Sequence, residues 1–229
     1  MLMFGDPATW PPDDCVAVTP PPTPEAVVQG YREGVFPMRL SDRPPGNRLM
    51  AWFSPSRRAI LPLDRLRVTR SLRKSVRRYR LTVDTDFPRV LAGCADPRRP
   101  HGWIDGRIRQ IYGELFDRGI VHTVETRDGD GRLVGGLYGV CVGGLFAGES
   151  MFHDPVHGRD ASKAALVGLV QVLRQGDHQR LLDVQWQTDH LASLGTVEVS
   201  RLDYLARLGA ARELPAPNWP DEIDPIAQP

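Results

Sequence analysis

The spacing of apolar residues along the chain predicts both helices and strands. Over 108–118, Ile111, Leu115 and Phe116 recur on one side at helical spacing, and Gly119 follows as a helix-ending residue. Over 122–126, the side chains alternate in the manner of a strand. The chain therefore combines helical and extended elements.

The same patterns divide the whole chain into short elements. We expect helices over 24–33, 70–78, 87–94, 108–118, 161–175 and 200–208, and strands over 81–83, 122–126, 133–142, 145–152 and 181–187. Asp160 is the expected N-cap of the helix over 161–175, and Gly176 its stop. This order fits an α+β fold best, with a mixed, mostly antiparallel sheet and helices on its faces.

Proline separates the two ends of the chain from its middle. Ten of the 21 prolines lie within the first 45 residues, and five follow Glu213. Because proline interrupts helices and central strands, both ends are predicted to hold little regular structure. We expect a small N-terminal domain over 1–55, a larger domain over 56–213, and a proline-rich, acidic tail over 214–229 that forms a strap or a loose end.

The composition is that of an ordinary globular protein. Of the 229 residues, 41% are hydrophobic and 25% are charged, which argues against wholesale disorder. We find no apolar run of about 18 residues and no signal-like N-terminus, so no membrane segment is expected. Three dispersed cysteines without a CxxC pair favour a reducing compartment. We expect a cytoplasmic monomer.

The charge is balanced in total but not in its distribution. The chain has 29 basic and 28 acidic residues, a net charge of +1. Between Arg57 and Arg80, ten basic residues accompany a single acid, Asp64, so this segment carries +9 and the remainder −8. Such a patch attracts polyanions such as nucleic acid, whereas most charge runs are solvated helix faces. The two interpretations have equal weight here, because the patch lacks acidic partners within helical reach.

Two stretches of the expected sheet carry candidate chemistry. On the strand over 181–187, Asp183 and Gln185 share a face, where a carboxylate and a carboxamide can orient an amine or accept a proton. A plain solvated face is the commoner meaning of this pattern. On the strand before it, Glu149 and Met151 share a face, which suits a pocket for an apolar group beside a cationic one. The alternative is a strand with one buried face, but the surrounding glycines favour close approach of a ligand or another backbone.

Other residues give weaker indications. Three aromatic residues, Tyr31, Trp52 and Trp103, could stack on a base, although most such residues belong to a core. His153 and His157 lie in a loop with Pro155, and no acidic or cysteine cluster completes a site, so no metal is expected. Glycine-rich phosphate-binding motifs and the GxSxG nucleophile motif are absent from the sequence.

Nine short motifs together resemble those of one family. The chain carries YREGVFP at 31–37, WFSP at 52–55, VTRSL at 68–72, GWI at 102–104, LVGGLYGV at 133–140, GESMF at 148–152, DASKAAL at 160–166, LDVQ at 182–185 and ASLG at 192–195. In this order, from about Tyr31 to Leu208, they closely resemble the leucyl/phenylalanyl-tRNA–protein transferases. The combination of GGLYGV, GESMF and DxQ is highly specific.

The resemblance implies a small N-terminal domain on a GNAT-like acyltransferase domain, and a cytoplasmic enzyme without metal or other cofactor. Such an enzyme takes Leu or Phe, and Met less well, from aminoacyl-tRNA. It adds this residue to the α-amine of a protein that begins with Arg or Lys, which marks that protein for bacterial degradation. Because the aminoacyl ester is already activated, holding it near the amine can supply much of the catalysis.

The resemblance also implies roles for individual residues. Gln185, oriented by Asp183, positions the amine or handles its proton, and a route assisted by the ribose hydroxyl is the alternative. Glu149 and Asp183 attract the cationic acceptor. The expected pocket for the Leu or Phe side chain is lined by Leu137, Gly148, Ser150 and Met151. The terminal adenosine is contacted by Tyr31, Trp103 and Met38, which stands where the family has tryptophan. The phosphates of the tRNA are held by Arg65, Arg67, Arg70, Arg73, Lys74, Arg77, Arg78 and Arg80.

Two other functions are compatible with the same fold. A CoA-dependent N-acyltransferase would need a pyrophosphate-binding loop before the helix over 161–175, and Val156–Asp160 does not have that pattern. A non-catalytic homologue would bind tRNA without transferring an amino acid.

Overall fold

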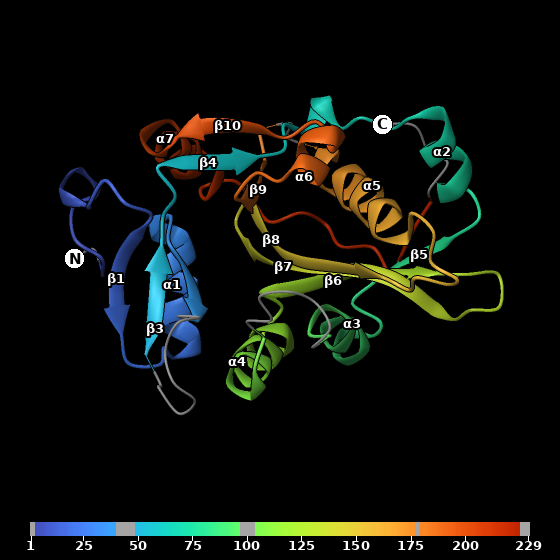
Figure 1. Cartoon of the computed structure of the whole chain (residues 1–229), viewed down its shortest axis with the longest axis horizontal. Helices are drawn as coiled ribbons and strands as arrows, with labels where there is room; N and C mark the ends of the chain where they lie inside the picture. Colours follow the sequence, from blue (N-terminus) through green and yellow to red (C-terminus); the bar gives the residue numbers. More distant parts are fainter. Residues whose placement is uncertain (1–2, 40–48, 97–103, 177–178, 225–229) are drawn as a thin grey trace.

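The computed structural model describes residues 3–39, 49–96, 104–176 and 179–224, whose strands form two separate sheets (Figure 1). In chain order the elements are the 3-10 turn η1 (Pro7–Thr9), β1 (Cys15–Thr19), α1 (Pro24–Glu33), β2 (Phe36–Arg39), β3 (Met50–Phe53), β4 (Arg57–Ile60), the 3-10 turn η2 (Leu63–Arg65), α2 (Arg70–Val76), β5 (Arg80–Val83), α3 (Phe87–Cys94), α4 (Gly106–Asp117), β6 (Val121–Arg127), β7 (Leu133–Val142), β8 (Leu145–His153), α5 (Ala161–Arg174), β9 (Leu181–Gln185), α6 (Asp189–Leu194), β10 (Val197–Ser200), α7 (Arg201–Ala211) and β11 (Glu222–Ile223). The smaller sheet has the order β1-β3-β2, and the larger one β10-β4-β9-β8-β7-β6-β5-β11.

Local capping signals account for most helix boundaries. Before α1, the side chain of Thr23 accepts a hydrogen bond from the Ala26 amide at 3.2 Å, and Gly34 ends the helix in the left-handed conformation at φ 87°. The prediction for the N-terminus of α5 was wrong in one respect. Asp160 adopts the left-handed conformation, and its carboxylate makes no capping bond but binds Lys163 and Ser75 instead.

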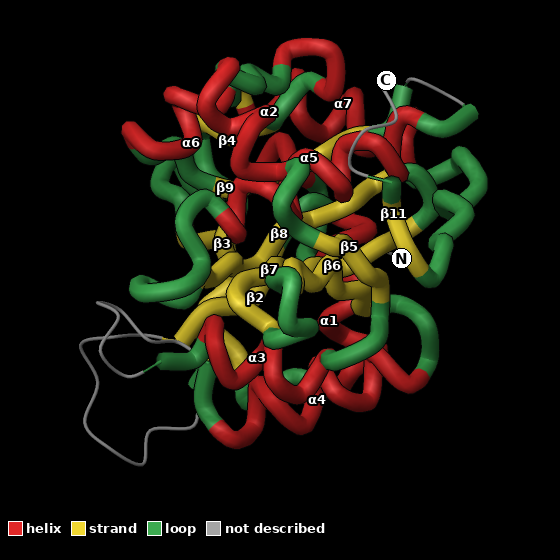
Figure 2. The backbone as a smooth tube through the Cα atoms, turned by 90° about the vertical axis from the view of Figure 1, so that its right-hand side faces the viewer, coloured by secondary structure: helices red, strands yellow, loops and turns green. Residues whose placement is uncertain are grey.

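The larger sheet is mixed and mostly antiparallel, as the order of elements predicts. In the described part of the chain, β8 and β9 form its only parallel pair. Helix α5 covers one face, and α3 and α4 lie on the other (Figure 2). The α+β prediction is thus confirmed, with helices on both faces of the sheet.

Several short elements escaped the sequence patterns. Strands β4 and β10 have four residues each and pair with one another, while β1 lies inside the proline-rich N-terminal region. Helix α6 has six residues. Elements this short contain too few positions to establish a period, so their pairing depends on the surrounding sheet.

Side chains alternate between two cores along β7. Leu137 belongs to the core under α5, together with Leu166 and Leu169. Its neighbour Tyr138 belongs to the core on the α4 side, where its ring meets that of Tyr112 edge-on at 5.8 Å. Both residues nevertheless line the cavity described below.

The glycines of this hairpin are required mainly by close approach of the chain to itself. A Cβ atom on Gly135 would lie 2.6 Å from the Cβ of Ala161, and one on Gly139 would lie 2.4 Å from the carbonyl oxygen of Ala147. Gly148 differs, because the nearest atom to its added Cβ would be the Asp183 carbonyl oxygen, at an ordinary 3.6 Å. At most positions, close packing of the chain therefore explains the glycines better than a bound ligand does.

The described part of the tail is a strap. Its strand β11 pairs with β5 at the edge of the larger sheet, and Ile223 is buried there. The ring of Trp219 stacks on His122 at 4.1 Å. Within the described ranges, no helix combines the length and the apolar character needed to cross a membrane.

Candidate active site

A cavity of about 210 Å³ opens between α5, α6 and the strands β7, β8 and β9. Its wall is mostly apolar and includes Leu166, Leu169 and Leu182 beside the four residues expected to form a side-chain pocket: Leu137, Gly148, Ser150 and Met151. Glu149, Gln185, Thr188 and His190 supply the polar part of the lining. The cavity thus offers an apolar space with a few polar groups, as small-molecule sites commonly do.

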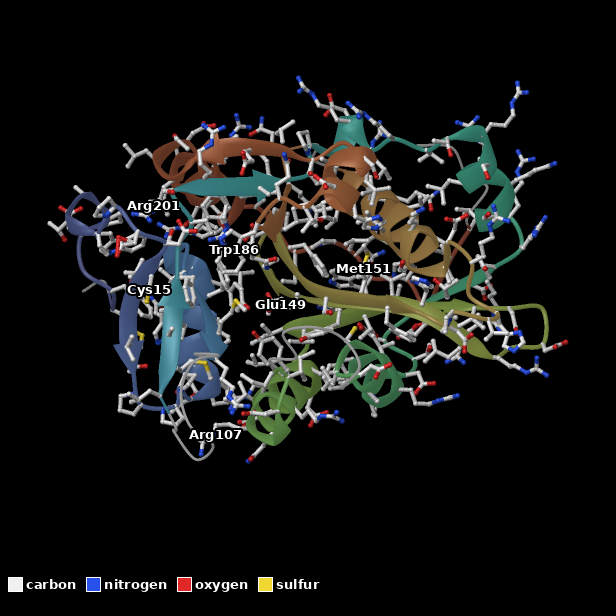
Figure 3. The ribbon with its side chains drawn as sticks, viewed as in Figure 1. Cys15, Arg107, Glu149, Met151, Trp186 and Arg201 are labelled. Atoms are coloured by element: carbon white, nitrogen blue, oxygen red, sulfur yellow. The ribbon has the colours of Figure 1, made fainter. Side chains whose placement is uncertain are left out.

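Glu149 is the acid of this cavity, and two buried tyrosines hold it in place. Its Oε1 accepts hydrogen bonds from the hydroxyl of Tyr31 at 2.7 Å and from Nε2 of Gln185 at 3.3 Å. The hydroxyl of Tyr112 lies 3.3 Å from its Oε2 and 2.8 Å from the Tyr31 hydroxyl. Figure 3 shows Glu149 and Met151 on the same strand, β8. A carboxylate, a carboxamide and two phenols therefore form one connected network.

The surroundings of Glu149 favour its protonated form. Burial among these side chains raises the pKa of the carboxyl from 4.5 to about 7, and the nearby carboxylate of Asp183 adds to this rise. Hydrogen bonds from Tyr31 and Tyr112, and the charge of Arg58, oppose it in part. A carboxyl group with a pKa near neutrality can both take up and release a proton, which is what acid–base chemistry at neutral pH requires.

Asp183 is placed differently from the sequence-based expectation. It is fully buried, and its Oδ1 and Oδ2 accept hydrogen bonds from Nε and Nη2 of Arg58 at 2.8 and 2.5 Å. The expectation that Asp183 attracts a cationic acceptor must be corrected, because its charge is already paired with a buried guanidinium. Glu149 is left as the acid that lines the cavity.

The expected alternation along β9 was also wrong at its end. A bulge places Ala59 opposite Gln185 and Ile60 opposite Asp183, and Gln185 has a φ of 60°. Val184 and Gln185 consequently both line the cavity, while Asp183 lies behind it. Asp183 still touches Gln185, because its Oδ1 accepts the Gln185 backbone amide at 2.9 Å.

The three residues expected to contact adenosine differ in how far the structure supports that role. Tyr31 is 1% exposed and its hydroxyl is bound to Glu149, so it offers no ring face for stacking on a base. Its observed role is to support Glu149. Met38 is half-buried on β2, and Trp103 lies outside the described residues.

The basic residues of the predicted phosphate-binding set are exposed on η2, on α2 and beside them. Arg80 is less available to a phosphate than the others, because its guanidinium forms two hydrogen bonds of 2.9 Å to Glu222 of the tail. The remaining exposed members are Arg65, Arg67, Arg70, Arg73, Lys74, Arg77 and Arg78. Helix α2 is attached to the start of α5 by the bond from Ser75 Oγ to Asp160 at 3.0 Å. The patch therefore adjoins the helix that covers the cavity.

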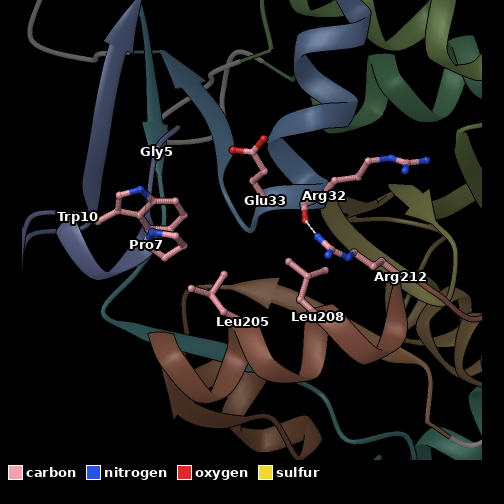
Figure 4. A pocket seen from close by; sticks show the side chains of 9 residues that line it. Gly5, Pro7, Trp10, Arg32, Glu33, Leu205, Leu208 and Arg212 are labelled. Carbon is pink, nitrogen blue, oxygen red and sulfur yellow. Dashed lines mark hydrogen bonds between the residues drawn. The ribbon is translucent and has the colours of Figure 1, made fainter. Parts of the chain in front are cut away.

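A second pocket, of about 150 Å³, lies between the N-terminal segment and α7 (Figure 4). The carboxylate of Glu33 in its wall accepts the backbone amides of Met3 and Phe4 at 2.8 and 2.9 Å. Nη1 of Arg212 donates to the Arg32 carbonyl at 3.1 Å. These polar groups serve to attach the N-terminal segment and α7 to α1. Among the described residues, no group of three or more His, Cys, Asp or Glu side chains is arranged to hold a metal ion.

Sequence reasoning missed Arg58, Tyr112 and Tyr204, which support the site from behind. Arg58 was counted with the basic patch because charge runs are most often exposed. The one available signal was its position beside the apolar stretch Ala59–Leu61, where alternation places residues 58 and 60 on the same side of a strand. Tyr112 and Tyr204 carry no comparable signal, because buried tyrosines are common in ordinary cores.

Comparison with known proteins gives a consistent match over most of the chain. Residues 60–209 match the family profile described as leucyl/phenylalanyl-tRNA protein transferase, and residues 21–56 match that of its N-terminal domain. The protein named leucyl/phenylalanyl-tRNA–protein transferase in Afipia carboxidovorans is 49% identical over 197 residues, which cover 84% of this chain and 83% of that protein. The protein of the same name in Rhodospirillum rubrum is 47% identical over 197 residues, which cover 84% of this chain and 88% of that protein.

Proposed function

Because the chain belongs to the leucyl/phenylalanyl-tRNA–protein transferase family and is thus an aminoacyl-tRNA–protein transferase, we propose that it transfers Leu or Phe, and Met less well, to the α-amine of proteins that begin with Arg or Lys. The acylated protein would then be marked for degradation, and the enzyme would act in the cytoplasm as a monomer. The observation that carries this proposal is the apolar cavity whose polar lining holds Glu149 and Gln185.

The donor side chain belongs in the apolar part of the cavity. Leu137, Met151 and Leu182 offer contacts to a Leu or Phe side chain without a polar group that would need a partner. Ser150 and Gly148 line the same cavity as Glu149, and the backbone of the aminoacyl group would sit at this more polar side. A volume of about 210 Å³ accepts one such side chain and leaves the ester at the polar end.

The reaction joins the acceptor amine to the ester carbonyl carbon, and the bond from that carbon to the ribose oxygen breaks. The nitrogen loses one proton and the ribose oxygen gains one. Gln185 donates to Glu149 through Nε2, so its carboxamide oxygen can accept a hydrogen bond from the amine and orient it. Glu149 can take the proton that the amine loses, directly or through the ribose hydroxyl, since its pKa lies near 7.

The same carboxylate attracts a basic acceptor. With Asp183 paired to Arg58, the charge that an N-terminal Arg or Lys meets in the cavity is that of Glu149. The exposed arginines of η2 and α2 lie beside α5, the helix that covers the cavity. They would hold the acceptor stem of the tRNA through its phosphates, independently of the tRNA sequence. Trp103 and Met38 remain candidates for the adenosine contact.

Transfer of labelled amino acids tests this proposal. Leu-, Phe- and Met-tRNA are each offered with peptides that begin with Arg, Lys, Ala or Glu, and the products are resolved by mass. We expect Leu and Phe on Arg- and Lys-headed peptides, little Met, and no product on the Ala- and Glu-headed controls. Binding of tRNA without product would favour a non-catalytic homologue, and tight binding of acetyl-CoA would favour the N-acyltransferase alternative.

A further inference from the structure

Arg58 is an almost completely buried cation beside the site. It is 1% exposed, and its guanidinium lies between two aromatic rings, 4.6 Å from the centre of Phe36 and 4.3 Å from that of Tyr204. Its Nη1 donates to the Gly34 carbonyl at 3.3 Å. The position of the guanidinium is therefore fixed from three directions by the N-terminal domain and α7.

Arg58 in turn fixes Asp183. The carboxylate accepts four hydrogen bonds: two from Arg58, one from the Tyr204 hydroxyl at 3.0 Å, and one from the Gln185 backbone amide at 2.9 Å. An ionised carboxylate has about four lone-pair sites, and donors fill all of them here. The carboxylate is therefore suited to hold these four donors in place.

The fourth bond reaches the site. Gln185 has a φ of 60°, an unfavourable conformation for a side chain other than glycine, and it persists only where the surroundings enforce it. The bond from its amide to Asp183 enforces it and aims the carboxamide at Glu149, 3.3 Å away. A bulge alone would leave the direction of this side chain undetermined.

We propose that Arg58 is a positioning residue for the transfer reaction: clamped between Phe36 and Tyr204, it holds Asp183 so that the Gln185 carboxamide stays against Glu149 beside the cavity. This inference rests on the proposed function. It also connects the N-terminal domain to catalysis, because Gly34 and Phe36 hold Arg58 while Tyr31 of the same segment holds Glu149. One segment of the small domain thereby aligns both polar groups of the site.

A purely structural role for this ion pair is a weak explanation. Replacing a buried ion pair by apolar side chains of similar size is often neutral or stabilising, so folding alone does not call for Arg58 and Asp183. Their joint effect on Gln185 is specific to the site and depends on the two-pronged geometry of the guanidinium, which lysine cannot reproduce.

The variant R58K tests this role, with R180K as the matched control. Arg180 is also a buried arginine, but it donates to the carbonyl groups of Leu173 in α5 and Pro215 in the tail, and it precedes β9 at the end of the strand away from Gln185. We expect R58K to lower kcat by 10-fold or more, up to about 100-fold, because small displacements of reacting groups have effects of this size. The Kd for Leu-tRNA should stay within about twofold of the wild type, and R180K should change neither quantity when rates are expressed per folded protein.

A double variant separates positioning from stability. R58M/D183L removes both charges together, so its thermal stability should exceed that of R58M. We expect its kcat to remain as low as that of R58K. Recovery of the wild-type kcat in R58M/D183L, or an R58K kcat equal to that of R180K, would overturn the positioning role while leaving the proposed function intact. Absence of transfer by the wild type itself would overturn the proposed function, and the positioning role with it.

Discussion

Replacement of Glu149 by glutamine changes one charge and very little else. The carboxamide keeps the size of the side chain and an oxygen that can accept the bond from Tyr31, which measures 2.7 Å in the structure. The variant removes the ability of residue 149 to ionise. Any difference in pH dependence between the two proteins therefore reports the titration of Glu149.

The magnitude follows from the pKa. Burial first, and the Asp183 carboxylate second, raise it from 4.5 to about 7 in the folded protein. Between pH 4.5 and about 7, Glu149 keeps its proton in the folded state but has lost it in the unfolded state. The stability of the folded protein therefore falls as the pH rises through this range. At about 1.4 kcal/mol per pH unit the wild type loses on the order of 3 kcal/mol relative to E149Q. This is an upper figure, because the side chain is only half-buried.

Chemical denaturation of both proteins between pH 4.5 and 8 measures this difference. We expect the free energy of unfolding of E149Q to increase relative to that of the wild type as the pH rises from 5 to 7. This difference should become constant above pH 7.5. Comparison with the variant cancels every other titrating group. Parallel stability curves for the two proteins would refute the assignment of a raised pKa to Glu149.

Three further predictions concern the cavity, the basic patch and the tail. M151W fills the apolar part of the cavity, so the ratio of Phe to Leu transfer, measured as kcat/KM, should fall by about tenfold; an unchanged ratio would place the donor side chain elsewhere. R73E/R77E reverses two exposed charges, one in α2 and one directly after it, so the affinity for every tRNA should fall alike and the slope of log Kd against log salt should decrease by about 2; a loss confined to one isoacceptor would contradict a phosphate-binding role. I223A removes a buried side chain from the strap on β5, and thermal denaturation should show a loss of about 2–4 kcal/mol without an effect on transfer below the melting temperature; equal melting curves would show that the tail is dispensable for stability.

Residues that act through their neighbours in sequence were predictable. Thr23, Pro24 and Gly34 delimit α1 by capping, and the structure has the helix at the expected boundaries. Capping signals are local, so the sequence contains them in full. The alternation expected in β8 was wrong at the site, because a bulge in its pairing with β7 leaves the four consecutive residues Gly148–Met151 all in the cavity wall. The expected pocket residues were identified by the family motifs instead.

Residues that act through partners far away in sequence were not predictable in this way. Arg58 and Asp183 are 125 positions apart, and nothing in the charge pattern shows which acid a given arginine meets. The bulge at Gln185 arises where β9 pairs with β4, a strand of four residues that gives no periodic signal. The family resemblance supplied the identity of Asp183 and Gln185, but not the burial of one behind the other.

The structure also changes the meaning of the basic segment between Arg57 and Arg80. Arg58 is neutralised inside the protein by Asp183, Arg57 lies 3.6 Å from Glu198, and Arg80 is paired with Glu222. Three of the ten basic residues are thus offset by acids outside the segment, and seven are left, from Arg65 to Arg78. Those seven lie in η2, in α2 and close to them, next to the helix that covers the cavity. Since exposed ion pairs contribute little and are easily exchanged, Arg57 and Arg80 could still join a phosphate contact, whereas Arg58 cannot. A tRNA can therefore contact fewer of these ten basic residues than the sequence suggests. The residue that it cannot reach, Arg58, is the one that holds Gln185 in place.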